Sequence, residues 1–190
     1  MSSLTKGTYM YWKLSARLIL AYSLLFLTLL TASHEISIDG RLDDAPWKQA
    51  VEYTKYYESL PFTLDEPKDF QKVLILEDEK GIYLGFVNEQ AKDTVRANKH
   101  ERDDEMANTD KAGLAIDFDG DGLAAYSFTV SASGSISDGI YRNENEVNYD
   151  WDADWKSAVF IDENFWYVEM FIPWTIAPMK SVEGLSLIHI

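Results

Sequence analysis

The sequence predicts an all-β protein, an antiparallel β-sandwich of jelly-roll type. Short segments in which apolar and polar residues alternate with a period of two recur along the chain, as half-buried strands require. Clusters of turn residues, among them Asp119 to Gly122 and Asp162 to Asn164, separate these segments. No stretch carries the apolar period of a long helix, so about eight strands and no long helix are expected.

Residues 1–33 have the pattern of a secretory signal peptide. Three basic residues precede an almost unbroken apolar run from Leu18 to Leu30. Thr31-Ala32-Ser33 then supplies small residues for cleavage after Ser33. The alternative is a transmembrane anchor, but the run is shorter than the roughly 20 apolar residues that a spanning helix needs. We therefore expect one exported domain over residues 34–190, located in the periplasm, at the outer membrane or outside the cell.

Charge and cysteine content narrow the classes of ligand. The 190 residues carry a formal net charge of −15 and no cysteine, so neither disulfides nor thiolate chemistry is available. Of the 17 basic residues, Lys6, Lys13 and Arg17 lie in residues 1–33, which hold no acid; residues 34–190 therefore carry 14 basic and all 32 acidic side chains. Such a surface repels nucleic acid and anionic membranes, and it suits metal cations or neutral ligands.

The segment from Ile36 to Ala50 is predicted to close one end of the β-structure. Alternation at its start indicates a strand, and Asp39-Gly40 is a turn pair. Asp43 and Asp44 are suited to cap a helical turn that Trp47 anchors in the core.

The strands follow in order, and Val73 to Leu76 is apolar throughout, which indicates a strand that is covered on both faces. Three hairpins are expected, with turns at Glu79-Lys80-Gly81 and at the two clusters named above. The predicted strands lie in residues 51–58, 73–76, 82–87, 113–118, 126–131, 136–141, 155–161 and 166–172.

Two segments do not fit this pattern. Residues 91–111 are crowded with charge and have no apolar period, so we expect a long exposed loop of the kind that is often functional or mobile. Residues 142–154 are polar as well, with Tyr149 and Trp151 embedded in them.

An ordered set of motifs runs over nearly all of residues 35–180. It consists of Ile38-Asp39-Gly40-x-Leu42-Asp43-Asp44-x-x-Trp47, Gly81 to Phe86, Arg102-Asp103-Asp104, Ile116-Asp117, Ala125 to Phe128, Gly134 with Asp138, Trp155, and Trp166-x-x-Glu169-x-x-Ile172-Pro173. Together these motifs resemble the family 9 carbohydrate-binding modules. In one branch of this family, the module heads large bacterial proteins whose remainder looks like an outer-membrane β-barrel.

The chain departs from this family in two respects. Members that bind sugar clamp it between two tryptophans, and the region that matches the first, Met106 to Asp110, has no aromatic residue. The second tryptophan would lie beyond the end of this chain. Gly184 to Ile190 matches the next strand of the family poorly, so we expect that the C-terminal strand is missing and that the last residues are not native.

Sugar-binding residues are predicted in the polar segment near residue 150. Aromatic rings stack on sugar faces and carboxylates bind hydroxyl groups, which makes Trp151, Tyr141, Tyr149 and Asp138 the candidates. The alternative for Trp151 is that it caps the core. Trp47, Trp155 and Trp166 lie at strand or helix spacing and are expected to pack in the core.

A calcium site is predicted at Asp117, Asp119 and Asp121, because hard cations bind several carboxylate oxygens on a flexible, glycine-rich backbone. The resemblance agrees, since relatives carry structural calcium. The alternative, which is compatible with an ion, is that Asp-Gly-Asp-Gly only makes a hairpin turn.

Catalysis is not expected in this domain. Asp103 with Asp104, or Asp150 with Asp152, are acid pairs of the kind that cleave glycosidic bonds, but acids are so common here that such pairs arise by chance. Three scattered histidines and no cysteine argue against a zinc site.

Together these observations favour a non-catalytic carbohydrate-binding accessory module of an exported or envelope protein, acting in polysaccharide degradation. Its partners would be a polysaccharide or oligosaccharide and a downstream catalytic or β-barrel domain. The alternative is a structural or interaction module attached to an outer-membrane β-barrel, with sugar binding lost. A weaker alternative is a fragment of a glycoside hydrolase.

Overall fold

The computed structural model describes residues 35–58, 63–104, 106–142, 146–178 and 186–188. The chain divides into a unit of residues 1–35 and a unit of residues 36–190, and the description below concerns the second. The predicted signal peptide lies outside the described residues. Within the described residues, no helix has both the length and the apolar character needed to cross a membrane.

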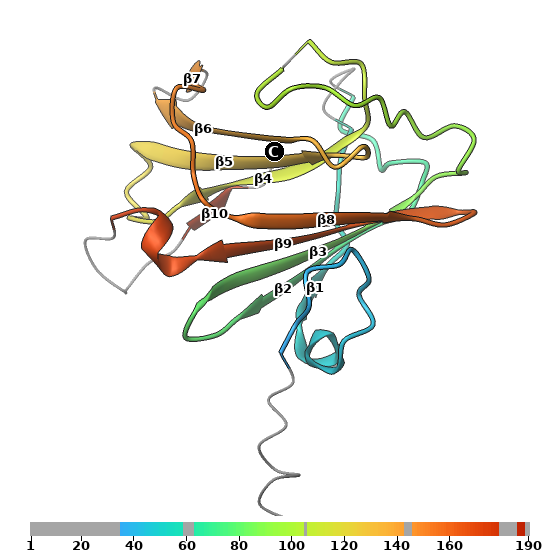
Figure 1. The fold of residues 1–190 in the computed structure, drawn as a ribbon, viewed down its shortest axis with the longest axis horizontal. Helices are drawn as coiled ribbons and strands as arrows, with labels where there is room; N and C mark the ends of the chain where they lie inside the picture. Colours follow the sequence, from blue (N-terminus) through green and yellow to red (C-terminus); the bar gives the residue numbers. More distant parts are fainter. Residues whose placement is uncertain (1–34, 59–62, 105, 143–145, 179–185, 189–190) are drawn as a thin grey trace, which may run out of the picture. The chain divides into compact units, whose positions relative to one another are not determined.

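Two five-stranded antiparallel sheets form the unit of residues 36–190 (Figure 1). The first sheet has the order β1-β2-β3-β9-β8 and the second has the order β10-β4-β5-β6-β7. The predicted fold class, an all-β antiparallel sandwich of jelly-roll type, is confirmed. The strands are β1 Val51–Tyr53, β2 Gln71–Glu77, β3 Gly81–Glu89, β4 Lys111–Asp117, β5 Ala124–Ser131, β6 Ile136–Arg142, β7 Glu146–Asn148, β8 Lys156–Ile161, β9 Phe165–Pro173 and β10 Ser186–Ile188.

The three predicted hairpins are confirmed as β2–β3, β4–β5 and β8–β9. Other predicted elements differ. The strand expected over residues 51–58 is limited to three exposed residues, and the polar segment after β6 contains the short strand β7. Residues 186–188, for which the sequence indicated no clear strand, pair with β4 at the edge of the second sheet.

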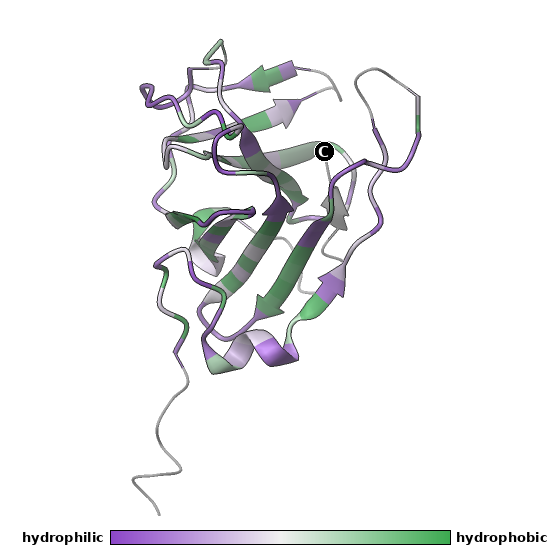
Figure 2. Cartoon of the chain, turned by 90° about the vertical axis from the view of Figure 1, so that its right-hand side faces the viewer, coloured by the Kyte–Doolittle hydropathy of each residue, from purple (hydrophilic) through white to green (hydrophobic). Residues whose placement is uncertain are grey.

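The main core lies between the two sheets. Phe128 and Val130 from the second sheet and Val168, Met170 and Ile172 from the first are all fully buried there. Trp155 and Trp166 belong to the same core, as predicted. Figure 2 shows the corresponding pattern, with hydrophobic positions (green) concentrated on strands and hydrophilic ones (purple) in the loops.

The opening segment agrees with the prediction in part. The helical turn that Trp47 anchors is confirmed as a short 3-10 helix, η1 (Ala45–Gln49). No strand forms at Ile36 and Ile38, although Ile36 is buried in a second, smaller cluster with Trp47. Asp44 precedes this helix, but its carboxylate makes no capping bond and accepts the backbone N–H of Ser37 at 2.8 Å instead.

Glu169 holds the opening segment on the outer face of the first sheet. Its carboxylate is completely buried and accepts the backbone N–H groups of Asp39 (2.9 Å) and Gly40 (2.8 Å) and the indole N–H of Trp47 (2.9 Å). Burial outweighs these hydrogen bonds and raises the pKa of Glu169 above its usual range. The motif that contains Asp39 and Trp47 and the motif that contains Glu169 are more than 120 residues apart in the chain, and they form one contact in the structure.

Candidate functional site

The strand register assigns the residues of β6 to two faces. Asp138 lies opposite Phe128, and Ile140 lies opposite Tyr126, on the face that packs in the core. Because successive side chains of a strand point to opposite faces, Tyr141 lies on the outer face of the second sheet. The predicted sugar-binding residues Asp138 and Tyr141 therefore lie on different faces.

Tyr149 joins Tyr141 on the outer face. The position of a Cβ atom on Gly139 would lie 3.3 Å from a ring carbon of Tyr149 and 2.8 Å from the carbonyl oxygen of Asn148. The missing side chain of Gly139 thus makes room for β7 and for the tyrosine ring. Both tyrosines are partly exposed, so their rings are partly accessible to a ligand.

The neighbouring positions on this outer face carry small or hydroxyl-bearing side chains. They follow from the register of β4, β5 and β6, in which every second residue belongs to the core. Three of these residues are buried, namely Ala115, Ser137 and Gly139, and three are partly exposed, namely Gly113 of β4 and Ser127 and Thr129 of β5. The part of this face that a ligand can reach therefore consists of small and hydroxyl-bearing side chains, with the two tyrosines at one side of it.

Asp138 lies at the centre of a buried polar network. Its carboxylate is fully buried, accepts two hydrogen bonds from the guanidinium of Arg102 (2.9 Å for Nε) and accepts the backbone N–H of Ala153 at 2.7 Å. Its own backbone N–H donates to Asp103 Oδ1 at 2.9 Å. Burial, which outweighs the bonds from Ala153 and Arg102, raises the pKa of Asp138. In this arrangement, Asp138 connects β6 to the loop before β4, which contains Arg102, and to the loop after β7, which contains Ala153.

Arg102 lies among several acids. The carboxylates of Asp103, Asp138 and Asp152 offer oxygens within 4.8 Å of one another, the one such group of three among the described residues. Arg102 forms ion pairs with all three, and its Nε lies 2.8 Å from Asp152 Oδ1. The guanidinium thus supplies the positive charge that a metal ion would otherwise bring.

Trp151 packs against the hydrophobic core. Its ring makes T-shaped contacts with Tyr126 (centroids 4.9 Å apart) and Phe128 (6.0 Å), and the residue is partly buried. Of the four predicted sugar contacts, the structure thus brings Tyr141 and Tyr149 together on the outer face.

The aspartate turn between β4 and β5 is closed by Asp117. Its carboxylate is 1% exposed and accepts the backbone N–H groups of Asp119 (3.1 Å), Gly120 (2.9 Å) and Gly122 (2.7 Å). Both oxygens are therefore engaged in the turn, and within the described part of the chain the three aspartates do not form a group of converging carboxylates. This arrangement fits the hairpin-turn alternative better than an ion site, and calcium binding there stays a prediction.

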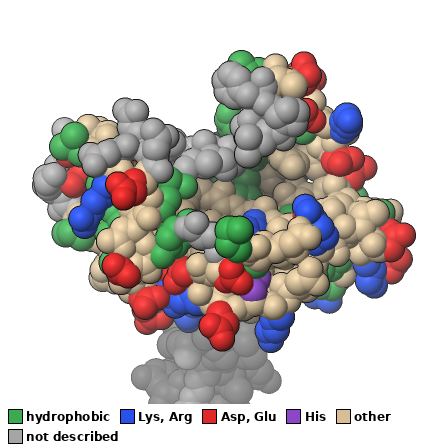
Figure 3. All heavy atoms as spheres, turned by 90° about the horizontal axis from the view of Figure 1, so that it is seen from above, with side chains coloured by type: hydrophobic (Ala, Val, Ile, Leu, Met, Phe, Trp, Pro, Cys, Tyr) green, Lys and Arg blue, Asp and Glu red, His purple; other side chains and the backbone are tan. Residues whose placement is uncertain are grey.

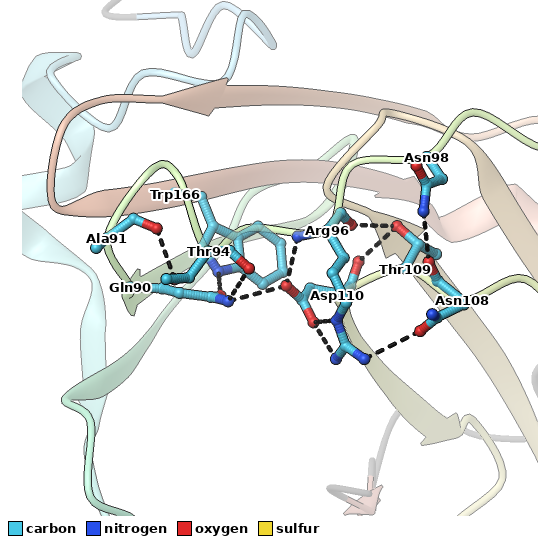
Figure 4. A network of polar contacts seen from close by, with 9 residues as sticks. All are labelled: Gln90, Ala91, Thr94, Arg96, Asn98, Asn108, Thr109, Asp110 and Trp166. Carbon is cyan, nitrogen blue, oxygen red and sulfur yellow. Dashed lines mark hydrogen bonds and ion pairs between the residues drawn. The ribbon is translucent and has the colours of Figure 1, made fainter.

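The charged segment between β3 and β4 is a loop, as predicted, but polar contacts fix it to the sandwich (Figure 4). Asp110 accepts from Arg96 Nε at 2.9 Å and from the Gln90 amide at 2.9 Å, and Trp166 Nε1 donates to Gln90 at 3.1 Å. Burial alone would raise the pKa of Asp110, but the bonds from Arg96 and Gln90 lower it. Composition does not reveal these pairings, because each joins residues that are distant in the chain.

A small cavity of about 110 Å³ opens where β2 begins, β3 ends and β4 begins. Tyr56, from the loop after β1, contributes to its lining. Sequence reasoning missed this feature, since its lining residues come from four separate segments.

No protein-family model matches this sequence, and no curated protein matches it. Among solved structures, the chain is similar to "A carbohydrate binding module family 9 (CBM9) from Caldicellulosiruptor kristjanssonii in complex with cellotriose", with 10% sequence identity and a TM-score of 0.46. The alignment covers 72% of this chain and 63% of that chain, so this chain spans less than two thirds of the length of that structure. A likeness at this identity and TM-score says nothing about what this chain binds.

Proposed function

We propose that this chain is a non-catalytic module of an exported protein, and that it binds a neutral polysaccharide or oligosaccharide on the outer face of its second sheet. The observation that carries the proposal is the placement of the partly exposed Tyr141 and Tyr149 on one face of the sheet, which also carries the partly exposed Ser127 and Thr129. Partly exposed aromatic rings next to a polar surface are suited to the apolar faces of sugar rings.

The polar groups and the charge of the chain support the same class of ligand. Ser127 and Thr129, both partly exposed, offer hydroxyl groups beside the tyrosines. The net charge of −15 disfavours anionic polymers. Figure 3 shows acidic side chains around the margin of the face in view, whereas its hollowed middle has few charged groups.

The alternative is a structural or interaction module in which sugar binding has been lost. One observation favours it: every tryptophan that the structure describes is buried or packed against the core, so none presents an open ring face. In the region where sugar-binding relatives place a tryptophan, Met106 is 91% exposed and no aromatic residue replaces it.

Calorimetric titration of the full-length chain with soluble glucan and xylan oligosaccharides tests the proposal. We expect saturable heat, and we expect Tyr141→Ala and Tyr149→Ala each to weaken binding by about tenfold, because each removes one stacking ring. Tyr57→Ala is the matched control, since Tyr57 is a 61% exposed tyrosine that belongs to the segment after β1 and not to the strands of the second sheet.

The two functions give different results in this titration. Absence of heat from a folded chain would overturn the sugar-binding proposal and leave the structural module. Equal loss in Tyr57→Ala would show that the ligand does not bind at the two tyrosines.

A further inference from the structure

The cavity between the two sheets has a lining that combines core residues with polar ones. Val73 of β2, Phe86 of β3 and Ala112 of β4 are buried members of the main core and form its apolar part. Its volume is about 110 Å³. The cavity shares no residue with the tyrosine pair.

The residues that line this cavity carry positive charge, whereas the net charge of the chain is negative. Two lysines, Lys72 and Lys111, line it, and no acidic residue is among the described residues of the lining. The chain overall carries 32 acidic and 17 basic residues. Glu52 pairs with Lys72 at 3.3 Å, but Glu52 is 59% exposed and does not belong to the lining. The local potential of the cavity is therefore more positive than that of the surrounding surface.

The neutral polar groups of the lining are good hydrogen-bond donors. Gln71 and Asn88 contribute carboxamides; the Asn88 amide donates one hydrogen to the Trp166 carbonyl at 3.4 Å and has a second one. The Tyr56 hydroxyl donates its hydrogen to the carbonyl of Tyr53 at 3.4 Å. Burial, together with the nearby Tyr53, raises the pKa of Tyr56 to about 12, so this hydroxyl keeps its proton at neutral pH. Ammonium and amide donors together form the set that a carboxylate requires, because an ionised carboxylate only accepts hydrogen bonds.

The size of the cavity limits what can enter. Pockets for drug-sized molecules have volumes of about 300–1,000 Å³, and an apolar cavity of about 150 Å³ takes up benzene. At about 110 Å³, this cavity admits a carboxylate group with a short stem, but it does not enclose a whole sugar ring.

We propose that this cavity is a binding site for a carboxylate group, which belongs either to a small aliphatic acid or to an acidic sugar residue. The lysines and amides hold the carboxylate, and Val73, Phe86 and Ala112 contact its stem. The cavity shares Gly113 with the neutral-sugar face but neither of its tyrosines, so the variants of Tyr141 and Tyr149 and the variants of the lysines test the two proposals separately.

Amide NMR shifts of the full-length chain provide the test. We expect sodium propionate at low ionic strength to cause saturable shifts at Asn88 and Ala112, which line the cavity and do not belong to the neutral-sugar face. Saturation at the same residues by glucuronate, at lower concentration than by propionate, identifies an acidic sugar as the source of the carboxylate; the reverse order identifies a small acid. Glucose is the neutral counterpart and is expected to leave these amides unchanged.

Three variants test which charged side chains affect binding of the carboxylate. Lys111→Met, at an exposed position, is expected to weaken binding about tenfold, because it removes one charge-assisted hydrogen bond. Glu52→Gln is expected to tighten binding, because it removes the negative charge beside Lys72. Lys156→Met is the matched control, since Lys156 is an exposed lysine outside the lining.

Several results would overturn the site. Shifts that do not saturate, shifts at other residues only, or equal shifts with glucose would each exclude a carboxylate pocket. If Lys111→Met and Lys156→Met had equal effects, binding would be explained by non-specific electrostatic attraction and not by this cavity.

Discussion

Two buried carboxylates, Glu169 and Asp138, organise the loops of this domain. Each accepts several hydrogen bonds from a segment distant in the chain, and each has no exposed surface. A buried acceptor left without its donors costs more than an ordinary hydrogen bond contributes, so each carboxylate specifies where its segment docks. Asp138, a predicted sugar contact, serves in this way as the partner of Arg102.

Glu169→Gln tests this role at the residue scale. The amide keeps the shape of the side chain, but its NH₂ group faces either the N–H groups of Asp39 and Gly40 or the indole N–H of Trp47. We expect the free energy of unfolding to fall by about 2 kcal/mol, measured by urea denaturation. Glu163→Gln is the control, because its side chain is 82% exposed. If the two variants were equally stable, Glu169 would not anchor the opening segment.

Among the strands, the close contact between Gly139 of β6 and the backbone of β7 positions the candidate sugar face. β6 and β7 pair over only three residue positions, and β7 lies at the sheet edge, so packing against Gly139 contributes much of what holds it. The ring of Tyr149 follows directly after β7 and depends on the same contact.

Gly139→Ala is expected to disturb both the strand and the site. The added Cβ would lie 2.7 Å from Val147 Cγ1 and 2.8 Å from the carbonyl oxygen of Asn148, closer than real contacts allow, so β7 must shift. We expect a loss of about 1–3 kcal/mol in unfolding free energy and weaker oligosaccharide binding. Gly134→Ala is an informative comparison: no atom lies within 4 Å of its Cβ position, but its φ of +82° strains an alanine. It should therefore lower stability without changing sugar affinity. If the Gly139→Ala variant folded and bound oligosaccharide as the wild type does, Tyr149 would not be part of the binding site.

Buried acids also affect the stability of the whole domain as pH changes. The pKa values of Glu169 and Asp138 are raised by burial, so at mildly acidic pH the folded chain binds more protons than the unfolded chain. Their combined contribution to stability is therefore largest below the ordinary carboxyl pKa, near 4, and declines as pH rises through the raised values. Asp110 acts in the opposite sense: its pKa is lowered, so its contribution is present above about 4 and is lost on acidification.

Denaturation of the wild-type chain and Glu169→Gln at a series of pH values from about 4 to 7 measures this effect. We expect the difference in stability between the two proteins to shrink as pH rises, because the penalty for ionising Glu169 exists only in the wild type. Parallel profiles would mean that Glu169 has the same pKa in the folded and unfolded states.

Local sequence patterns are sufficient to predict the β-sandwich and its hairpins, whereas the arrangement of the loops and of the candidate site depends on tertiary contacts. Alternation with a period of two and short turns are local signals, so the pairs β2–β3, β4–β5 and β8–β9 were predictable. Trp47, Trp155 and Trp166 were likewise predictable as core residues.

The remaining features depend on contacts between distant segments. Register alone assigns Asp138 to the core face and Tyr141 to the outer face, and docking of β7 against Gly139 brings Tyr149 beside it. Trp151, two residues further on, packs on Tyr126 and the core instead. The polar segment around residue 150 has no regular period, so only the packing of its side chains decides which of them face the ligand and which face the core.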